Sequence, residues 1–550
     1  MTSKQTNRRD FLKGGAALAG AAAVGAASGG WPGASWAAGA PVEAPKLLTS
    51  NAQFDPVRPE AARLISQAAR QVGFAIEATP QDYNLGIQKV IKEHDFDLFL
   101  VRLTGQSVRI DPDVFIHKVN HSSNHRSGGF NWTGYRNARV DELAAAQQVE
   151  MDPVKRREMV HEAQVLIAQD QPQNAIVYPA MTNAYRSDRL ANLTPQMGEG
   201  IGSLWTDISM TVIEGDGYVR TGATTPLKNL NPIAANDATE FKELRMIYDS
   251  LFQVDPGGKV VPWAAESHTI VDETTIEVTI RDGMKWHDGP PVTAADVKFS
   301  FDYQKQWKAP FFVSSLEKIE SVEVIGKHSV RFTLTDPFAP LFANLFSALM
   351  LIPEHIWKNI PEGVDVDDPL NYPNLTPVGS GPFRFDYWDR GKELKVSANT
   401  EHHRAPKSAG VIRIVYGSHD AMAAAIEKNE CDRTRYILKP NLMDALNKVE
   451  GVVGQGYPSH GFYCLSYNVT KPPFDNPAIR EAMQYIIPRE LIRDIVLGGH
   501  AESGGSVIAP VNEFWHNPAV KAPGQDLDKA KKILSDAGFT WSGNQLHYPA

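Results

Sequence analysis

Cysteine is almost absent from this chain of 550 residues, which contains only Cys431 and Cys464. Two cysteines cannot hold an iron–sulfur cluster, and no Cys-x-x-Cys pair occurs. The chain lacks a Gly-x-x-x-x-Gly-Lys-Ser/Thr loop, which excludes the ATPase of a transporter. It also lacks a Gly-x-Ser-x-Gly elbow and a His-Glu-x-x-His run, so no nucleophile–base pair or zinc-protease motif points to catalysis.

Excess basic charge and long internal apolar runs are missing as well. The formal net charge is −9, which argues against nucleic acid or an anionic lipid surface as a partner. With 42% hydrophobic and 22% charged residues, the composition is that of an ordinary globular protein. After the N-terminus, no segment reaches membrane-spanning length.

The N-terminus carries an export motif. Residues 8–13 read RRDFLK and precede an Ala/Gly-rich segment over residues 14–30, with small-residue cleavage sites at 35–37 or 38–40. This pattern predicts a twin-arginine (Tat) signal peptide over residues 1–40. The alternative, an N-terminal membrane anchor, is disfavoured because the segment is short and weakly hydrophobic. In the oxidising compartment that follows, the two cysteines could pair, which the sequence leaves open.

Residues 274–303 (TTIEVTIRDGMKWHDGPPVTAADVKFSFDY) form the most informative stretch. Apolar and polar residues alternate over residues 276–280, which predicts a half-buried strand. Residues 284–286 predict a second short strand between two turns. Thr293 is expected to cap a helix, with Asp296 as the capping-box acid.

The wording of this stretch, RDG-KWHDG-PVTA-DV-FSF, resembles the signature of periplasmic solute-binding proteins of the peptide/nickel class, the receptors of ABC importers. Residues 224–232 (TTPLKNLNP), 377–383 (PVGSGPF), 421–432 and 468–499 resemble further motifs of that family. The family usually has aspartate where Pro488 stands, which puts the cap of the following helix in doubt.

The order of the motifs is unusual. Residues 94–178 resemble the C-terminal half of the family, although they precede the signature. The resemblance therefore implies an α/β fold of the periplasmic binding protein type, two α/β lobes with a hinge plus a smaller extra domain, in circularly permuted order. A recombined or wrongly assembled gene is the alternative. The expected parts are residues 1–40, signal; 41–178 and 458–550, one lobe; 179–258 and 378–457, the other lobe; and 259–377, the extra domain.

The resemblance places the ligand between the lobes. Peptide receptors of this family hold the peptide amine with an aspartate, and the equivalent position here is Val108, so an ordinary oligopeptide is disfavoured. Arg433 and Arg435 stand at a pocket-lining place, and their guanidinium forks suit an anionic group; a solvated basic turn is the alternative. For Trp132, Phe462 and Tyr463 the alternative is core packing. The candidates are Thr104, Gln106, Trp132, Thr225, Leu227, Arg433, Arg435, Tyr436, Phe462 and Tyr463.

Histidines give a weaker signal. His117, His121 and His125 are spaced four apart, so on one helix face they could bind Ni²⁺ or Zn²⁺. His125 is expected to fall beyond the helix end, which favours surface histidines. His117 and His121 are therefore weak metal candidates, and no cofactor is expected.

These features predict a periplasmic receptor, not an enzyme, that binds a small peptide-like, polar or anionic ligand and delivers it to an inner-membrane ABC permease. The Tat translocon is the expected partner during export, and a monomer is expected. A Tat-exported metal-binding protein or enzyme, and a sensor or chaperone on the same fold, remain the alternatives.

Overall fold

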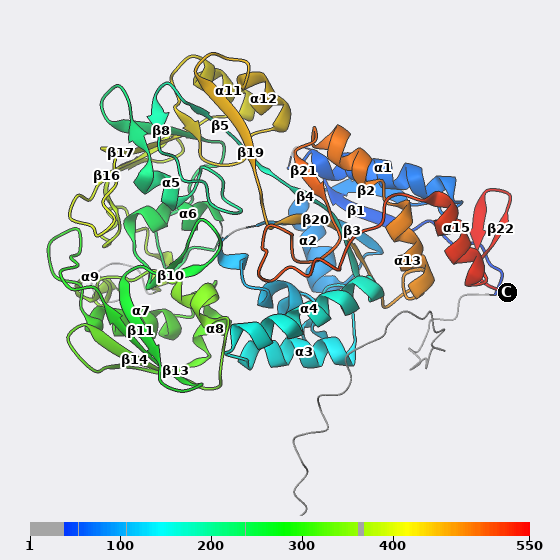
Figure 1. Cartoon of the computed structure of the whole chain (residues 1–550), viewed down its shortest axis with the longest axis horizontal. Coiled ribbons are helices and arrows are strands. Elements are labelled where there is room, and N and C mark those ends of the chain that lie inside the picture. The colour runs from blue at the N-terminus through cyan, green and yellow to red at the C-terminus, as the bar shows by residue number, and fades with distance from the viewer. Residues whose placement is uncertain (1–37, 53, 106, 237, 361–367) are drawn as a thin grey trace, which may run out of the picture. The chain divides into compact units, whose positions relative to one another are not determined.

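The computed structural model describes residues 38–550 except 53, 106, 237 and 361–367, so nearly all of the predicted signal segment lies outside the described residues. The two large sheets belong to two different lobes (Figure 1). The first sheet has six strands in the order β2-β1-β3-β20-β4-β21. Its strands are β1 (Lys46–Ser50), β2 (Glu77–Gln81), β3 (Leu98–Leu103), β4 (Gln173–Pro179), β20 (Phe462–Tyr467) and β21 (Ala501–Ser503).

The first lobe begins with the β-α-β unit that hydrophobic periodicity suggests. β1 pairs in parallel with β2 and with β3, whereas β20 pairs antiparallel with β3 and with β4. Helix α1 (Val57–Gln71) connects β1 to β2 and buries Ala61 and Ile65 against the sheet. Gly73 ends this connection with a φ of 77°, a conformation that favours glycine.

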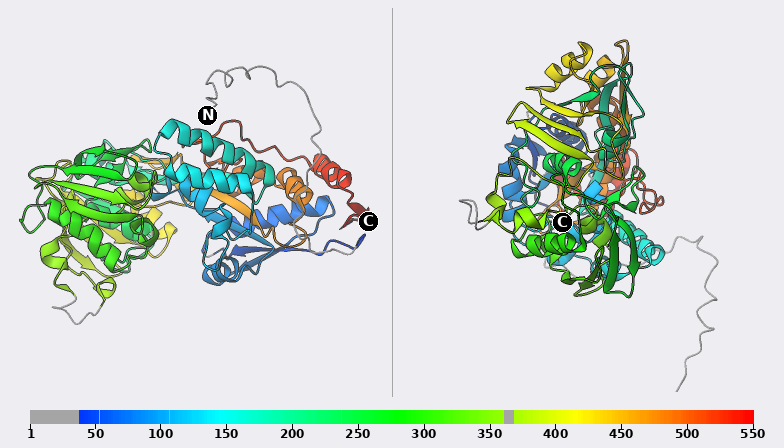
Figure 2. Two further views of the ribbon diagram at one scale, coloured as in Figure 1. Left: turned by 90° about the horizontal axis from the view of Figure 1, so that it is seen from below. Right: turned by 90° about the vertical axis from the view of Figure 1, so that its left-hand side faces the viewer.

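The longer helices of this lobe start at side chains that cap them. Asn137, Asp152, Asn476 and Asp526 each accept hydrogen bonds from backbone N–H groups of the first turn. Pro488, by contrast, provides no side-chain cap. In Figure 2 (left) the cyan α3 and α4 run together, and Arg139 pairs with Glu162 between them at 2.7 Å. The helices of this lobe are α2 (Tyr83–Ile87), α3 (Ala138–Val149), α4 (Pro153–Asp170), α13 (Pro477–Ile486), α14 (Arg489–Leu491) and α15 (Leu527–Asp536).

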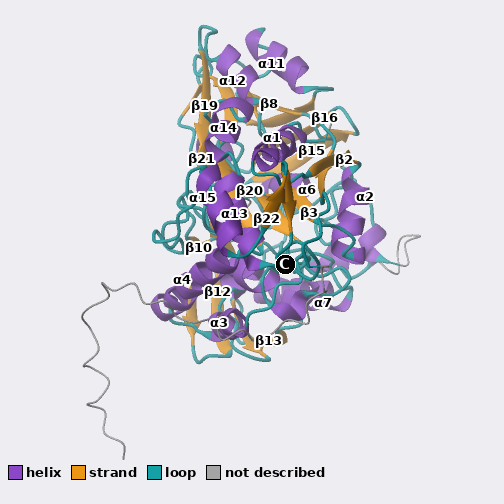
Figure 3. Ribbon diagram, turned by 90° about the vertical axis from the view of Figure 1, so that its right-hand side faces the viewer, coloured by secondary structure: helices purple, strands orange, loops and turns teal. Residues whose placement is uncertain are grey.

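Two segments that are far apart in sequence share the core of this lobe. One core cluster contains buried residues from Val42 to Tyr178 and from Phe462 to Tyr548. The start of the described residues meets the C-terminal segment there: Val42 N donates to Leu546 O at 2.8 Å, next to the hairpin of β22 (Thr540–Ser542) and β23 (Gln545–His547). Figure 3 shows α13, α15 and α4 on the side that carries the C-terminus. The lobe is therefore completed by non-covalent contacts between the two segments, and the permuted order stays a prediction.

The second sheet has seven strands in the order β15-β16-β17-β8-β18-β5-β19. Helices α5 (Leu204–Ser209), α6 (Ala238–Ile247), α11 (His419–Glu427) and α12 (Pro440–Leu446) belong to the same lobe. Its strands are β5 (Met181–Arg186), β8 (Tyr218–Ala223), β15 (Phe383–Asp389), β16 (Glu393–Ala398), β17 (Gly410–Val415), β18 (Arg433–Thr434) and β19 (Val452–Tyr457). This lobe also contains two separate two-stranded antiparallel sheets. One pairs β6 (Leu190–Ala191) with β7 (Thr211–Val212), and the other pairs β9 (Phe252–Val254) with β10 (Val260–Pro262).

The signature stretch lies in an extension of the second lobe. Four antiparallel strands, helices α7 (Ala294–Gln306), α8 (Val313–Leu316) and α9 (Glu354–Trp357) make up this extension, which shares one hydrophobic cluster with the lobe. Thr293 and Asp296 form the predicted capping box of α7. The predicted strand at residues 284–286 is wrong, because only Lys285 forms an isolated bridge, to Pro291. The strands are β11 (Ala265–Ile270), β12 (Thr275–Ile280), β13 (Ile319–Val324) and β14 (Ser329–Leu334).

The chain passes between the two large sheets at two places. β4 leads directly into β5 through Ala180, and β19 leads into β20 through residues 458–461. Elsewhere the two sheets meet through loops and side chains. Among the described residues, no helix combines the length and apolarity that a membrane span requires.

The two cysteines do not form the bridge that the sequence left open. Both are free and buried. Cys431 lies in a small core around α11 and α12, whereas Cys464 lies in β20 within the core of the first lobe. Burial raises the pKa of each thiol to about 12, so both stay protonated and unreactive at neutral pH.

Candidate functional site

A cavity of about 180 Å³ lies where the loop after β3 faces α6 of the other lobe. Residues of both lobes line it, as a ligand site between lobes requires. The lining is rich in charged and aromatic side chains. The lining residues are Arg102, Thr104, Gly105, Ser107, Met181, Gly198, Glu199, Phe241, Lys242, Arg245, Tyr436 and Ile437.

Helix α6 supplies Lys242 and Arg245, two of the three cations of the cavity, and the signature motifs support its C-terminal end. Gly379 and Gly381 approach Ile247 so closely that a Cβ atom at Gly379 would lie 2.0 Å from the Ile247 carbonyl oxygen. His287 N donates to Gly379 O at 2.8 Å, and the His287 ring contacts Gly381 O at 3.0 Å. The KWHDG and GSGP motifs thus position α6 rather than contact the cavity.

Glu199 links the two lobes at the cavity wall. It accepts a hydrogen bond from Ser107 Oγ at 2.8 Å, and Arg245 donates to the same Oγ at 2.8 Å. Glu199 also pairs with Arg245 at 3.3 Å and with Lys242 at 3.7 Å. Burial alone would raise the pKa of Glu199, but the two cations outweigh it and lower the pKa to about 2. The carboxylate is therefore charged at neutral pH.

The cations at this wall have too few carboxylates and hydrogen-bond acceptors to balance their charge. Lys242 and Arg245 are each 8% exposed, and burial lowers the pKa of Lys242 despite the attraction of Glu199. The guanidinium of Arg102 lies 5.5 Å from the centroid of the Tyr463 ring. The buried Nε atoms of Arg102 and Arg245 have no hydrogen-bond partner among the described residues. Three cations thus face the single carboxylate of Glu199 across a small cavity.

A second cluster of cations lies behind α6 and is closed to ligands. Arg435 donates to Asp207 at 2.6 and 2.8 Å and pairs with Glu243 at 3.1 Å. Arg433 donates to Asp207 and to the backbone oxygen of Ile201. Arg433, Arg435, Asp207 and Glu243 have fully buried side chains.

Taken together, the two clusters bury more positive than negative charge. Arg413 joins the second cluster by pairing with Glu243 at 2.9 Å. Because buried charge is costly unless it is paired, the excess favours an anion at the open side of α6. The buried cations are Lys242, Arg245, Arg413, Arg433 and Arg435, and the buried carboxylates are Glu199, Asp207 and Glu243; Arg102 at the cavity is half-buried.

A wider cavity of about 980 Å³ lies on the other side of the loop that carries Glu199. Gln196 and Met197 line the wide cavity, while Gly198 and Glu199 line the small one. Gly198 has a φ of 77°, and a Cβ there would lie 2.1 Å from the backbone oxygen of Gly105. Only glycine permits this approach of the two lobes.

The walls of the wide cavity are mainly apolar and aromatic. Phe342, Tyr457, Phe514 and Trp515 line it. Its buried charges are paired, because Arg156 contacts Asp111 at 2.6 Å, and the exposed Lys259 and Glu513 carry opposite charges. This cavity therefore suits the uncharged body of a ligand better than a charged group.

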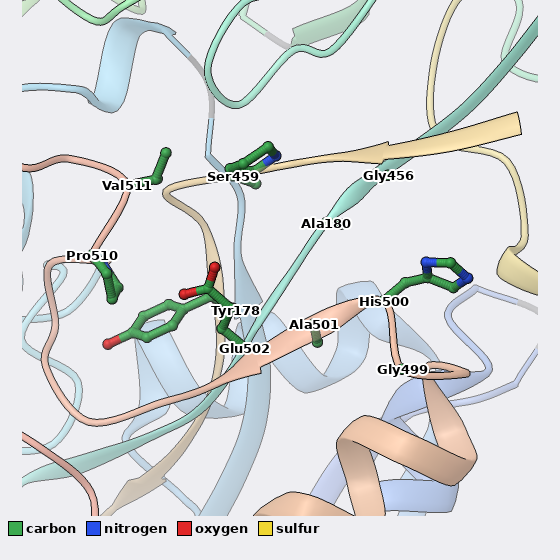
Figure 4. A pocket seen from close by; sticks show the side chains of 11 residues that line it. Tyr178, Ala180, Gly456, Ser459, Gly499, His500, Ala501, Glu502, Pro510 and Val511 are labelled. Carbon is green, nitrogen blue, oxygen red and sulfur yellow. The ribbon is translucent and has the colours of Figure 1, made fainter.

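A third cavity, of about 260 Å³, lies at the strands that cross between the sheets. Figure 4 shows Tyr178 and Glu502 on one side of this crossing and His500 on the other. The Tyr178 hydroxyl donates to Ser506 O at 2.6 Å, and His500 contacts Asp444 of α12 at 3.0 Å. The first contact lies within the first lobe, whereas the contact of His500 with Asp444 joins the two lobes next to the chain crossings, where a hinge motion would act.

The predicted site residues occupy different environments. Thr104 and Tyr436 line the small cavity. Trp132, Phe462 and Tyr463 lie in the core of the first lobe, and Leu227 lies in the core of the second, which fits the packing interpretation. Thr225 is exposed, Gln106 lies outside the described residues, and the side chain of Val108 is not described either.

The predicted arginines are neither solvated nor open to a ligand in this structure. Arg433 and Arg435 have 0% exposure, and protein acceptors bind their donors. A ligand anion would have to displace Asp207 or Glu243 to reach them. Their ligand role therefore stays a prediction.

The weak metal candidates lie close together without forming a site. The His117 and His121 rings are 4.7 Å apart, and His121 lies 3.9 Å from Asp141. Burial lowers the pKa of His117. Among the described residues, no group of three or more His, Cys, Asp or Glu side chains is placed to hold a metal ion.

Sequence reasoning missed Lys242, Arg245 and Glu199. In the run EFKELRMIYDSLF, charged residues on a helix normally indicate a solvated face. The signal that was available is the spacing: Lys242 and Arg245 are three apart and share a helix face within an otherwise apolar segment. Glu199 gave no signal, because its partners come from other parts of the chain.

Comparison with known proteins identifies relatives of this chain. The glutathione-binding protein GsiB of Salmonella typhi is 28% identical over 318 residues, covering 56% of this chain and 59% of that protein. GsiB of Escherichia coli K12 is 27% identical over 317 residues with the same coverage. The chain thus spans about three fifths of the length of the curated relatives it matches.

Solved structures show the same fold. A periplasmic oligopeptide-binding protein of Thermotoga maritima aligns with a TM-score of 0.50 and 23% identity, covering 60% of this chain and 63% of that one. This likeness confirms the predicted α/β fold of the periplasmic binding protein type.

Family models account for both ends of the chain. Residues 5–25 match the twin-arginine translocation signal sequence, which confirms the predicted Tat export to the periplasm. Residues 259–548 match the model of bacterial extracellular solute-binding proteins, family 5 (middle region). Because this match covers more than half of the 550 residues, the chain belongs to the bacterial extracellular solute-binding proteins of family 5.

Proposed function

We propose that this protein is a periplasmic receptor that binds a small solute between its two lobes and delivers it to an inner-membrane ABC permease. The observation that carries the proposal is the small cavity, because both lobes build its wall and meet there through Ser107, Glu199 and Arg245. The two chain crossings provide the hinge about which such lobes close on a ligand.

The relatives support this function. GsiB is named for binding glutathione, and the fold neighbour is named for binding oligopeptides. Because the match covers three fifths of GsiB, the solute is open. The partners of this receptor would be the permease and, during export, the Tat translocon.

The protein acts in this proposal as a binder and not as a catalyst. Its relatives are binding proteins, and the sequence contains no nucleophile–base motif. Incubation with glutathione or peptides is expected to give binding without any change in the ligand.

Mass spectrometry of protein purified under native conditions tests the proposal. Denaturation should release a bound small molecule, whose identity names the solute class. Calorimetry with that molecule, and with glutathione as a defined probe, should give binding, and small-angle X-ray scattering should show a smaller radius of gyration in the bound form. Turnover of the ligand by homogeneous protein would overturn the receptor function.

We also propose that the chain carries its family's fold in circularly permuted order. The support is that residues 42–178 and 462–548 share one core although a whole lobe separates them in sequence. The test is a chain in which residues 41–178 follow residue 550. Since loop-closure entropy grows only logarithmically, its unfolding free energy should change by about 1–3 kcal/mol. A chain opened within α13 is the control and should fold poorly, and failure of both chains would contradict the permutation.

A further inference from the structure

We infer that the small cavity takes an anionic group of the solute, a carboxylate in the first instance, held by Arg102, Lys242 and Arg245. This inference rests on the proposed receptor function and names the chemical class of its ligand. It assigns the role to these three residues and not to Arg433 or Arg435.

The charge of the lining favours an anion in the small cavity. Arg102, Lys242 and Arg245 line the cavity with one carboxylate, Glu199, between them. Lys242 and Arg245 are more than nine-tenths buried, so water screens their charge poorly. A ligand anion would supply the negative charge that the protein does not provide here.

Hydrogen-bond donors in the cavity wall also favour an anion. The Nε atoms of Arg102 and Arg245 are buried and have no acceptor among the described residues. Lys242 lies 3.7 Å from Glu199, beyond ordinary hydrogen-bond distance, and 4.9 Å from the centroid of the Tyr436 ring. Donors are thus available at the wall, whereas the donors of Arg435 are bound by Asp207 and Glu243.

The size and polarity of the small cavity favour a compact charged group. A cavity of about 180 Å³ is smaller than the roughly 300–1,000 Å³ of most ligand pockets, so it fits a compact anion or one charged end of a longer solute. Phe241, Met181 and Tyr436 provide apolar surface for the carbon atoms next to the charged group.

Matched pairs of probes test the inference on the full-length mature protein. Succinate and glutathione are the anionic probes, and succinamide and glutathione diethyl ester are the corresponding probes without carboxylates. Calorimetry and thermal-shift assays should show that only the anionic members bind. Replacing one charged donor should weaken binding of an anion about tenfold or more.

Arg102→Met is the main variant, because no hydrogen bond among the described residues depends on its side chain and the fold should persist. Lys242→Met is the second variant. Lys327→Met is the control, since Lys327 is an exposed cation in the turn between β13 and β14 and lines none of the three cavities described above. Both cavity variants should lose anion affinity, while the control should bind as the original protein does.

The outcomes separate the inference from the receptor function. If the solute released from the native protein is neutral or cationic, or if the uncharged probes bind as well as the anions, the anion site is refuted and the receptor stands. Equal loss in Lys327→Met would also refute the specific site. If no small anion shifts the melting temperature, the inference fails, whereas the receptor function fails only if no released solute and no binding are found.

Discussion

Two sets of basic side chains flank the same helix, α6, and behave differently. Lys242 and Arg245 face the small cavity, where Glu199 is the one carboxylate of the described residues that pairs with them. Behind the helix, Arg435 contacts two carboxylates, one of them Glu243 of α6 itself. The first set has donors to spare, and the second set has none that a ligand can reach without breaking an ion pair.

The difference shows that a basic residue indicates a ligand site only when its surroundings leave it unmatched. A buried cation whose carboxylates are at 2.6–3.1 Å stabilises the protein, because removing it would strand those acids. A buried cation with too few acids is a cost to the free protein that an anionic ligand can offset. Four experiments would break or sharpen this comparison.

Removal of a matched cation should have the largest effect. Arg435→Met leaves Asp207 and Glu243 buried with one partner fewer each and should lower the free energy of unfolding by about 3–5 kcal/mol. Urea unfolding followed by circular dichroism measures this loss. If stability instead changes little while ligand affinity falls at least tenfold, Arg435 contacts the ligand, and the two sets of basic residues do not differ in the way described here.

The pH dependence of stability should show the contribution of Glu199, the carboxylate that joins the lobes. Since the pKa of Glu199 is lowered from 4.5 to about 2, its contribution to stability is complete above pH 4.5 and is lost as the pH falls towards 2. This amounts to about 3 kcal/mol, because each pKa unit corresponds to about 1.4 kcal/mol. Glu199→Gln should therefore lose less stability than the original protein between pH 4.5 and 2. Identical pH slopes in the two proteins would show that Glu199 is not held by Lys242 and Arg245.

Gly198→Ala tests the close approach of the lobes beside the cavity. Both Gly198 and Gly283 have φ near +78°, but a Cβ at Gly283 meets nothing within 4 Å, whereas one at Gly198 would lie 2.1 Å from Gly105 O. Each alanine variant should cost about 1–2 kcal/mol for the left-handed backbone. Only Gly198→Ala should cost about 1–3 kcal/mol more from overpacking and should weaken ligand binding. Equal melting temperatures and affinities in the two variants would contradict the approach.

Removal of an unmatched cation should have the smallest effect on stability. Arg102→Met leaves no carboxylate of the described part of the chain without a partner, so its free energy of unfolding should stay within about 0.5 kcal/mol of the original value. The same urea titration as for Arg435→Met provides the measurement. A loss as large as that of Arg435→Met would mean that Arg102 holds the fold and is not free for a ligand.

Local sequence patterns predicted much of the fold. The capping box of Thr293 and Asp296 and the alternation in β12 depend on residues that are near in sequence, and the structure contains both. The short strand expected at residues 284–286 is wrong, because strand pairing requires partners that a local pattern does not reveal. The aromatic candidates Trp132 and Phe462 could not be divided between core and cavity, since apolar side chains suit both.

The sequence by itself determined the family, the α/β fold and the export route, because sequence motifs and hydrophobic periodicity are formed by neighbouring residues. Only the tertiary structure decided which cations lack enough nearby carboxylates to balance their charge. Arg435 meets Asp207 from a separation of 228 residues, and Ser107 meets Arg245 from a separation of 138. Charge type is a property of the residue, but whether that charge is paired depends on which distant carboxylates the fold brings within about 4 Å.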